Sequence, residues 1–209
     1  PGDLGCREVS GAHMYNVPMA RTVRLVQDLV AILKLWGLIR RLRPHIVHTQ
    51  TSKAGVIGRL AARLAGAPII IHTAHAFPFH SNLRPAVRWR YIVIERWMAR
   101  LTDLIIVDTE SVRSDGLRER VVHAQEKLVT VPMGLDLQKF SPSKSGPGNL
   151  RAALGVRPRS LVVGTVARLV PDKGMDCFLE MAVRILAVRQ DAIFMIVGDG
   201  PIRGALQQR

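Results

Sequence analysis

The sequence has few cysteines, few acidic residues relative to basic ones, and no long apolar run. Its two cysteines, Cys6 and Cys177, fit no metal-ligand spacing and fall in separate predicted domains, which disfavours a structural zinc site and a disulfide-stapled fold. A reducing cytosol is the simplest interpretation. Lys34 and Gly37 interrupt the most apolar stretch before it reaches the roughly 18 apolar residues that a membrane span requires.

Several nucleotide-binding and metal-binding motifs are also missing. The pair Gly198 and Gly200 does not extend to Gly-x-Gly-x-x-Gly, since the next glycine, Gly204, comes one place too late. The stretch 52–55 lacks the preceding glycines of a Walker loop. The sequence shows no cluster of metal ligands, so we expect no metal and no cofactor.

Basic side chains dominate the charge, with 30 lysines and arginines against 16 acidic residues and a net charge of +14. This charge tolerates phosphate and raises the alternative of a nucleic-acid-binding module. No zinc spacing, helix-turn-helix signature or base-stacking motif accompanies it. We therefore expect no nucleic-acid partner.

The densest basic stretch is 84–100, where five arginines accompany Trp89, Tyr91 and Trp97 against a single acid, Glu95. On a helix this composition predicts peripheral contact with an anionic membrane. The alternative is a solvated helix whose apolar residues pack inward. In that case the inward residues are Ile92, Val93, Ile94 and Met98.

The chain alternates strand-like and helix-like segments. Apolar runs predict strands near 45–49, 69–73, 103–108, 127–131, 161–166 and 192–197, and helical periodicity predicts helices near 21–43, 53–65, 84–101, 111–122 and 175–190. The apolar side of the first helix should hold Leu25, Leu29, Ile32, Leu33, Trp36 and Ile39. Repeated strand-helix-strand units predict an α/β fold with parallel sheets and right-handed crossovers. A stretch rich in Ser, Pro and Gly places a linker at 141–150, between domains at 1–140 and 151–209.

Arg168 and Lys173 lie in the loop between the predicted strand 161–166 and the next helix. This loop leaves the C-terminal end of the strand, and open α/β sheets bind their ligands at the C-terminal ends of their strands. Two cations five positions apart, with Gly174 letting the backbone approach, suit a nucleotide diphosphate that leaves with extra negative charge. The alternative is a solvated basic loop.

The turn Gly198-Asp199-Gly200-Pro201 follows the next buried strand and precedes another predicted helix. Together with the preceding loop, it resembles the C-terminal domain of the retaining GT-B glycosyltransferases of the family 4 type, which include capsule, exopolysaccharide and lipid-glycan transferases. The resemblance implies a donor diphosphate held by Arg168 and Lys173, a nucleotide pocket lined by Gly198, Asp199 and Gly200, and an interdomain loop that contains Gly134 and Asp136.

The first domain carries further matching segments at 44–55, 64–68 and 71–75, which resemble the acceptor-side domain of the same enzymes. The likeness therefore runs from about residue 20 to the end. It places the catalytic candidate His75 at a strand edge, in the interdomain cleft and beside the transferred sugar. The alternatives are a capping or core role for His75, and confusion with His72, which we place on the same face of the strand.

The resemblance implies a GT-B fold of two Rossmann-like domains, the second incomplete. It implies transfer of a sugar from a nucleotide-diphosphate donor, with uridine as the base, to a glycan or lipid-linked acceptor, with retention of configuration. The enzyme would be cytoplasmic, at the inner face of the cell membrane. The alternatives are a nucleotide-sugar 2-epimerase of the same fold and a non-catalytic binding remnant.

The sequence departs from the family pattern at several points. Ala76 and Ala167 stand where the family commonly has glycine, and Met133 stands where it often has asparagine, so these changes affect donor fit more than fold. The family's two glutamates eight positions apart are missing, because no two of the six glutamates have that spacing. The glycine-rich first loop is missing too. We therefore expect an internal segment of a longer enzyme, or a naturally truncated relative, that does not turn over alone.

Overall fold

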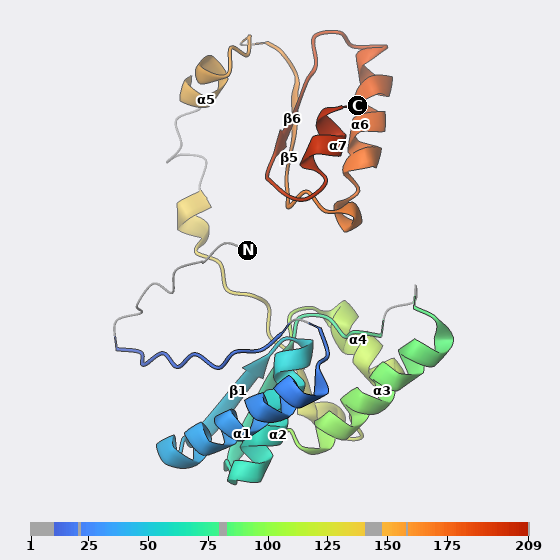
Figure 1. Ribbon diagram of the computed structural model, residues 1–209. Helices are drawn as coiled ribbons and strands as arrows, with labels where there is room; N and C mark the ends of the chain where they lie inside the picture. Colours follow the sequence, from blue (N-terminus) through green and yellow to red (C-terminus); the bar gives the residue numbers. More distant parts are fainter. Residues whose placement is uncertain (1–10, 21, 80–82, 141–147, 158, 209) are drawn as a thin grey trace. The chain divides into compact units, whose positions relative to one another are not determined.

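The computed structural model describes residues 11–20, 22–79, 83–140, 148–157 and 159–208. The chain divides into two compact units, Pro1–Gly134 and Leu135–Arg209, and each is described by itself (Figure 1). Each unit contains a parallel sheet flanked by helices. The predicted α/β class with parallel sheets is confirmed.

Unit 1 is built on four parallel strands that follow one another in chain order: β1 (Ile46–Gln50), β2 (Ile69–Ala74), β3 (Leu104–Val107) and β4 (Leu128–Thr130). One row of the register joins Thr49, His72, Ile105 and Leu128 across all four strands. Since paired residues of parallel strands point to the same side of a sheet, these four side chains share one face.

The helices of unit 1 are α1 (Leu25–Leu42), α2 (Ser52–Ala65), α3 (Pro85–Arg100) and α4 (Glu110–Arg118), and a short 3₁₀ turn, η1 (Gln125–Lys127), precedes β4. Local chemistry sets their ends. Gly66 ends α2 in the left-handed conformation, Pro85 opens α3, and the Thr109 hydroxyl accepts a hydrogen bond from the Val112 amide at the start of α4. The predicted helix positions are confirmed to within a few residues.

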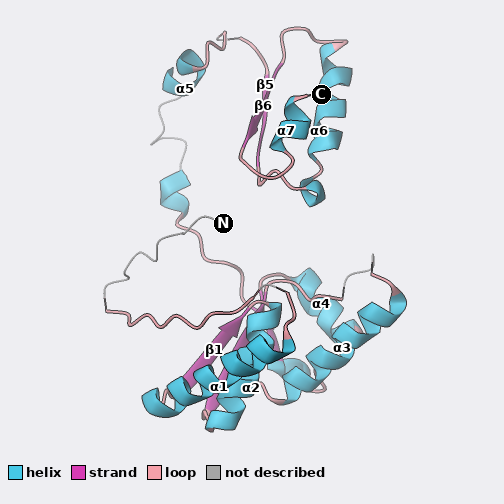
Figure 2. Cartoon of the chain, in the orientation of Figure 1, coloured by secondary structure: helices cyan, strands magenta, loops and turns pink. Residues whose placement is uncertain are grey.

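The core of unit 1 lies on one face of its sheet. Strands in chain order joined by right-handed crossovers place α2, α3 and α4 on the same side, and Figure 2 shows α1 and α2 lying over the strands. Two apolar clusters fill this layer. The smaller joins Ala62, Ala67 and Ile70, and the larger contains Ala74, Phe79, Ile92, Ala99, Ile105, Val107, Val121, Val122 and Leu128.

Helix α1 exposes much of its predicted apolar side. Leu25, Leu29 and Leu33 are 81%, 57% and 55% exposed, whereas Ala31 is buried and Ile39 packs beside the smaller cluster. The predicted apolar side is present, but its first half is left uncovered. The reason is that α1 packs against α2, another helix, and so covers only a narrow stripe of its own surface.

Unit 2 contains a two-stranded parallel sheet of β5 (Val162–Val166) and β6 (Ile193–Val197). Its helices are α5 (Gly148–Ala153), α6 (Met175–Leu186) and α7 (Arg203–Gln207), with 3₁₀ turns η2 (Leu137–Phe140) and η3 (Pro171–Lys173). Phe178 of α6 meets Phe194 of β6 edge to face, which joins helix and sheet.

The division between the units falls after Gly134, a few residues before the linker that the sequence places at 141–150. Residues 141–147 lie outside the described residues, and α5 begins at Gly148, inside the predicted range. The linker therefore stays a prediction.

Candidate functional site

Arg168 and Lys173 lie just beyond the C-terminal end of β5, in the loop that leads to α6. Arg168 follows the strand by two residues, and Lys173 ends the turn η3 immediately before Gly174, which has φ 64°. Both cationic side chains are exposed, and the nearest acid to Lys173 is Asp172, with its Oδ2 at 4.0 Å from Nζ. Within the part of the chain that the structure describes, Arg168 forms no ion pair. Its charge is thus available to an anion.

The turn at Gly198, Asp199 and Gly200 is bonded directly to this loop. The Ala167 amide donates to the Val197 carbonyl at 3.0 Å, and the Leu169 amide donates to the Asp199 carbonyl at 2.9 Å. These bonds extend the β5–β6 ladder beyond the strands. They hold the two predicted parts of the donor site side by side at one edge of the sheet.

This contact also explains the two glycines of the turn. A Cβ atom at Gly198 would lie 1.9 Å from the Ala167 carbonyl oxygen, and one at Gly200 would lie 2.2 Å from the Leu169 carbonyl oxygen. The loops could not approach each other with any larger residue at either position. From the sequence these glycines were related to ligand approach alone, and their packing role was not predicted.

Gly134 and Asp136 flank the division between the two units. Asp136 Oδ1 accepts a hydrogen bond from the Gln138 amide at 3.2 Å and so caps the turn η2. A Cβ atom at Gly134 would have no neighbour within 4 Å. Packing within the described residues therefore gives Gly134 no reason to be glycine.

His75 lies directly after β2, at the C-terminal edge of the sheet in unit 1. Its Nδ1 atom is 2.6 Å from Oδ2 of Asp108, which directly follows the neighbouring strand β3. The His75 side chain is 44% exposed and the Asp108 side chain 20% exposed. His75 was predicted from the sequence and Asp108 was not. The place of Asp108 directly after a buried strand marks it as a candidate, but its pairing with His75 depends on strand register.

His72 is a core residue and lies on the opposite face of the strand from His75. Placing both on one face was wrong, because residues three apart on an extended strand point to opposite sides. Its ring is buried against α2, and Nδ1 is 2.9 Å from the Thr49 hydroxyl. Burial, reinforced by the charge of Arg59, lowers the pKa of His72 to about 3. The ring is therefore neutral and structural at pH 7.

The segment 49–58 is shaped around that ring. A Cβ atom at Gly55 would lie 2.4 Å from Cε1 of His72, and one at Gly58 would lie 2.7 Å from Cγ2 of Thr49. Lys53 points elsewhere, donating to the carbonyls of Ala20 and Thr22 at 2.7 and 2.5 Å. The motif at the start of α2 is thus used for packing and for holding the segment before α1.

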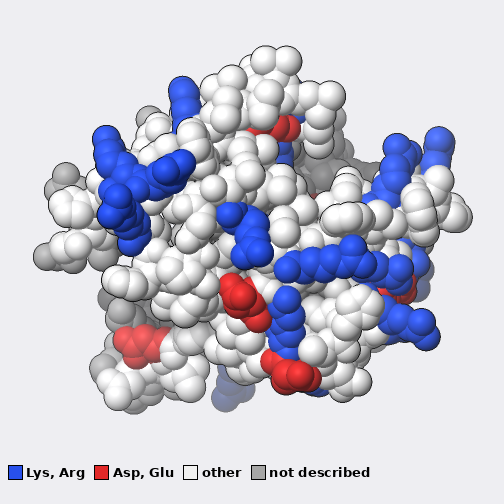
Figure 3. All heavy atoms as spheres, turned by 90° about the horizontal axis from the view of Figure 1, so that it is seen from below, with Lys and Arg blue, Asp and Glu red and all other residues white. Residues whose placement is uncertain are grey.

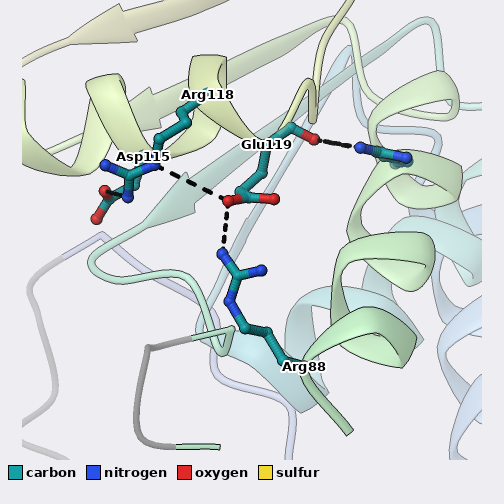
Figure 4. Close-up of polar contacts among 5 residues, drawn as sticks. Arg88, Asp115, Arg118 and Glu119 are labelled. Carbon is teal, nitrogen blue, oxygen red and sulfur yellow. Dashed lines mark hydrogen bonds and ion pairs between the residues drawn. The ribbon is translucent and has the colours of Figure 1, made fainter. Parts of the chain in front are cut away.

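Helix α3 divides the basic stretch 84–100 between internal and surface roles. Arg88 pairs with the Glu119 carboxylate at 2.5 Å, and Arg96 donates two hydrogen bonds to the Glu119 carbonyl at the end of α4. Figure 4 shows Glu119 between Arg88 and Arg118, with Asp115 beyond Arg118. Glu95 is buried and paired with Arg59 of α2 at 3.2 Å. The only acid of the stretch is thus withdrawn from the surface.

The outer side of α3 carries aromatic and cationic side chains together. Trp89 and Trp97 are 64% and 60% exposed, and the Arg100 guanidinium lies over the Trp97 ring at 4.9 Å. Ile92 and Met98 pack inward as the alternative interpretation expects, whereas Ile94 does not. More widely, Figure 3 shows one face of the molecule on which lysine and arginine cover more of the surface than acidic side chains.

Among the described residues, no three His, Cys, Asp or Glu side chains gather closely enough to hold a metal ion. Within the same ranges, no helix combines the length and the apolarity needed to cross a bilayer. Cys177 is an exposed free thiol, and Cys6 lies outside the described residues.

Comparison with known proteins gives related sequences over most of the chain. A model of the glycosyl transferase 4-like domain matches residues 1–134. The chain is 34% identical over 191 residues to UDP-Gal:alpha-D-GlcNAc-diphosphoundecaprenol alpha-1,3-galactosyltransferase of Escherichia coli, covering 90% of this chain and 49% of that protein. The chain therefore spans about half the length of this relative.

Solved structures agree on the fold. Anabaena HepE in complex with UDP and glucose superposes with a TM-score of 0.70 at 20% identity, over 90% of this chain and 50% of HepE. A putative UDP-N-acetylglucosamine 2-epimerase from Listeria monocytogenes superposes with a TM-score of 0.56 at 15% identity, over 90% of this chain and 48% of the epimerase. At these identities the likeness establishes the GT-B architecture alone.

Proposed function

Because this chain belongs to the glycosyl transferase 4-like family, we propose that it forms part of a glycosyltransferase that moves a sugar from a nucleotide-diphosphate donor to a glycan or lipid-linked acceptor. Uridine is the proposed base, since the Escherichia coli relative takes UDP-Gal and HepE was solved with UDP. We propose retention of the anomeric configuration, in keeping with the resemblance to retaining enzymes.

The observation that carries this proposal is the joined pair of loops at the end of β5 and β6. An exposed Arg168 precedes the turn η3, an exposed Lys173 ends it, and the Gly198–Gly200 turn is hydrogen-bonded to the same loop. Guanidinium and ammonium groups at a strand edge bind a diphosphate and stabilise the charge that develops on it as it leaves. The turn then contacts the nucleoside.

In unit 1 we propose His75 as the group that meets the transferred sugar. An exposed imidazole at a strand edge can exchange hydrogen bonds with sugar hydroxyls. For this chain by itself we propose donor binding without turnover, because no two of its six glutamates stand eight positions apart.

Calorimetry with uridine diphosphate tests the donor site. The wild-type chain should bind, and the double change Arg168→Ala with Lys173→Ala should lose at least about tenfold in affinity, because two charge-assisted contacts disappear. The double change Arg184→Ala with Arg189→Ala is the matched control: it removes the same charge from α6 and from the segment that follows it. An equal loss of affinity in both variants would mean that net charge, and not these two side chains, determines the binding of uridine diphosphate.

A 2-epimerase is the second candidate, because a protein of that class shares the fold. It would bind the same nucleotide, so binding does not separate the two. Incubating the full-length protein with UDP-N-acetylglucosamine and no acceptor does: an epimerase changes the sugar configuration, whereas a transferase leaves it unchanged or releases it to water.

We also propose that the outer side of α3 contacts anionic lipid, which would hold the enzyme at the cytoplasmic face of a membrane beside a lipid-linked acceptor. Support comes from the exposed Trp89 and Trp97, the neighbouring Arg100, and the withdrawal of Glu95 into the interior. Tryptophan suits the bilayer interface, and arginine suits its negative surface.

Sedimentation with vesicles tests this contact. The chain should bind phosphatidylglycerol vesicles more strongly than phosphatidylcholine vesicles, and Trp89→Ala with Trp97→Ala should weaken the binding. Arg118→Gln on α4 is a control for charge, since that side chain is 68% exposed and already paired with Asp115. Unchanged binding in the tryptophan variant would remove α3 from the proposal.

A further inference from the structure

The ends of β2 and β3 bring an imidazole and a carboxylate together at the sheet edge. Ala74 pairs with Val107 in the last row of the register. His75 and Asp108 follow as the next residues of the two strands, and their side chains meet at 2.6 Å. The contact is therefore a consequence of strand register.

The segments that follow His75 and Asp108 fix the positions of both residues. After His75 the chain turns inward, and Phe77 and Phe79 stack at 4.9 Å, with Phe79 buried in the larger core cluster. After Asp108, Thr109 caps α4. Neither residue can leave the sheet edge without disturbing the core or a helix start.

We propose that Asp108 is a positioning residue that fixes the tautomer and direction of the His75 ring. A carboxylate only accepts hydrogen bonds, so the proton in this contact belongs to Nδ1 of His75. Nε2 then carries the lone pair and accepts a hydrogen bond from a ligand hydroxyl. The charge-assisted bond selects this tautomer over the one with Nε2 protonated.

The ligand's identity as a sugar rests on the proposed function, whereas the state of the ring does not. A histidine with the opposite tautomer would offer an N–H donor in place of an acceptor. Asp108 thus decides which partner the exposed ring can bind: a hydroxyl that donates. A sugar supplies several such hydroxyls.

The test is a long-range proton–nitrogen NMR correlation of the ¹⁵N-labelled chain, at a pH where the histidines are neutral. The variant His75→Gln assigns the His75 signals. In the wild type the Nδ1-protonated form should dominate. In Asp108→Ala the ratio of Nδ1-protonated to Nε2-protonated ring should fall by about tenfold, the effect of losing one charge-assisted hydrogen bond.

Two controls keep the result interpretable. Asp115→Ala removes an acid from α4 and should leave the His75 ratio unchanged. The signals of His72, which is buried against Thr49, report whether the fold survives. If Asp108→Ala unfolds, Asp108→Asn replaces it and should lower the ratio, because a neutral amide accepts a weaker bond.

The proposal would be overturned if the wild-type His75 ring were protonated mainly at Nε2. It would also be overturned if the ratio of the two tautomers were the same in Asp108→Ala as in the wild type. The result is independent of donor binding, which depends on residues of unit 2. A correct tautomer in a chain that fails to bind uridine diphosphate would count against the proposed function and leave the role of Asp108 standing.

Discussion

Gly55 illustrates how a motif glycine can be required by a neighbouring side chain. Its missing Cβ atom leaves room for the His72 ring, which would otherwise lie 2.4 Å away. We expect Gly55→Ala to destabilise the protein by about 1–3 kcal/mol, although alanine is the better helix former. Urea unfolding measures this.

Gly37 is the matched control for that change. It lies inside α1, and a Cβ atom there would meet nothing within 4 Å. Gly37→Ala should therefore be neutral or stabilising by up to about 1 kcal/mol. Equal effects at the two glycines would refute the packing role of Gly55.

His72 should make the stability of unit 1 depend on pH. Burial lowers its pKa from an ordinary 6.5 to about 3. Between these pH values the His72 side chain is protonated in the unfolded chain and neutral in the folded chain. The free energy of unfolding is therefore highest above pH 6.5, and it falls progressively as the pH is lowered toward 3. At pH 5 the loss is about 2 kcal/mol.

Urea unfolding at pH 7.5 and pH 5 checks this prediction. The variant His72→Gln should lose less unfolding free energy between these two pH values than the wild type. A loss of the same size in His72→Gln would mean that other groups cause the acid sensitivity.

At the scale of elements, a buried ion pair joins α2 to α3. Arg59 is fully buried, its Nη2 lies 3.2 Å from Oε2 of Glu95, and its Nη1 has no hydrogen-bond partner among the described residues. Glu95→Ala would leave an unpaired buried guanidinium, so we expect destabilisation of about 3–5 kcal/mol.

An exposed pair supplies the comparison for Glu95. Asp115 and Arg118 form an ion pair on the surface of α4, and solvent screens such pairs. Asp115→Ala should change the unfolding free energy by less than about 1 kcal/mol. If Glu95→Ala lowers the unfolding free energy by no more than Asp115→Ala does, the buried position of the Arg59–Glu95 pair has no effect on stability.

The order and type of the elements were predictable from the sequence, because apolar runs and helical periodicity report burial locally. The strands near 69–73 and 103–108 are present as β2 and β3. The buried side of α1 was not predictable in the same way. Periodicity shows that a helix has an apolar stripe, but whether the stripe is covered depends on neighbours that the pattern does not name.

At the scale of the molecule, the uncovered stripe of α1 should cause self-association. Leu25, Leu29 and Leu33 are all more than half exposed, and Val26 is 78% exposed beside them. Contiguous apolar surface of this kind favours association. In sedimentation velocity, Leu29→Lys should shift the chain toward monomer at equal protein concentration. Unchanged association of Leu29→Lys would mean that a surface other than α1 mediates it.

The candidate site was predictable in part. Arg168, Lys173 and the Gly198–Gly200 turn are recognised by type and spacing, and the structure brings them to one sheet edge. Asp108 was not predicted, because its significance depends on the register between β2 and β3. The true reason for Gly198 was missed for the same cause, since a backbone approach between two distant loops leaves no local pattern.

The most direct test of the donor site follows backbone amide shifts of the ¹⁵N-labelled chain while uridine diphosphate is added. We expect the largest shifts on Arg168, Lys173 and the Gly198–Gly200 turn, at the shared edge of β5 and β6. Saturable shifts that fall elsewhere, or no shifts in a folded chain, would contradict this expectation.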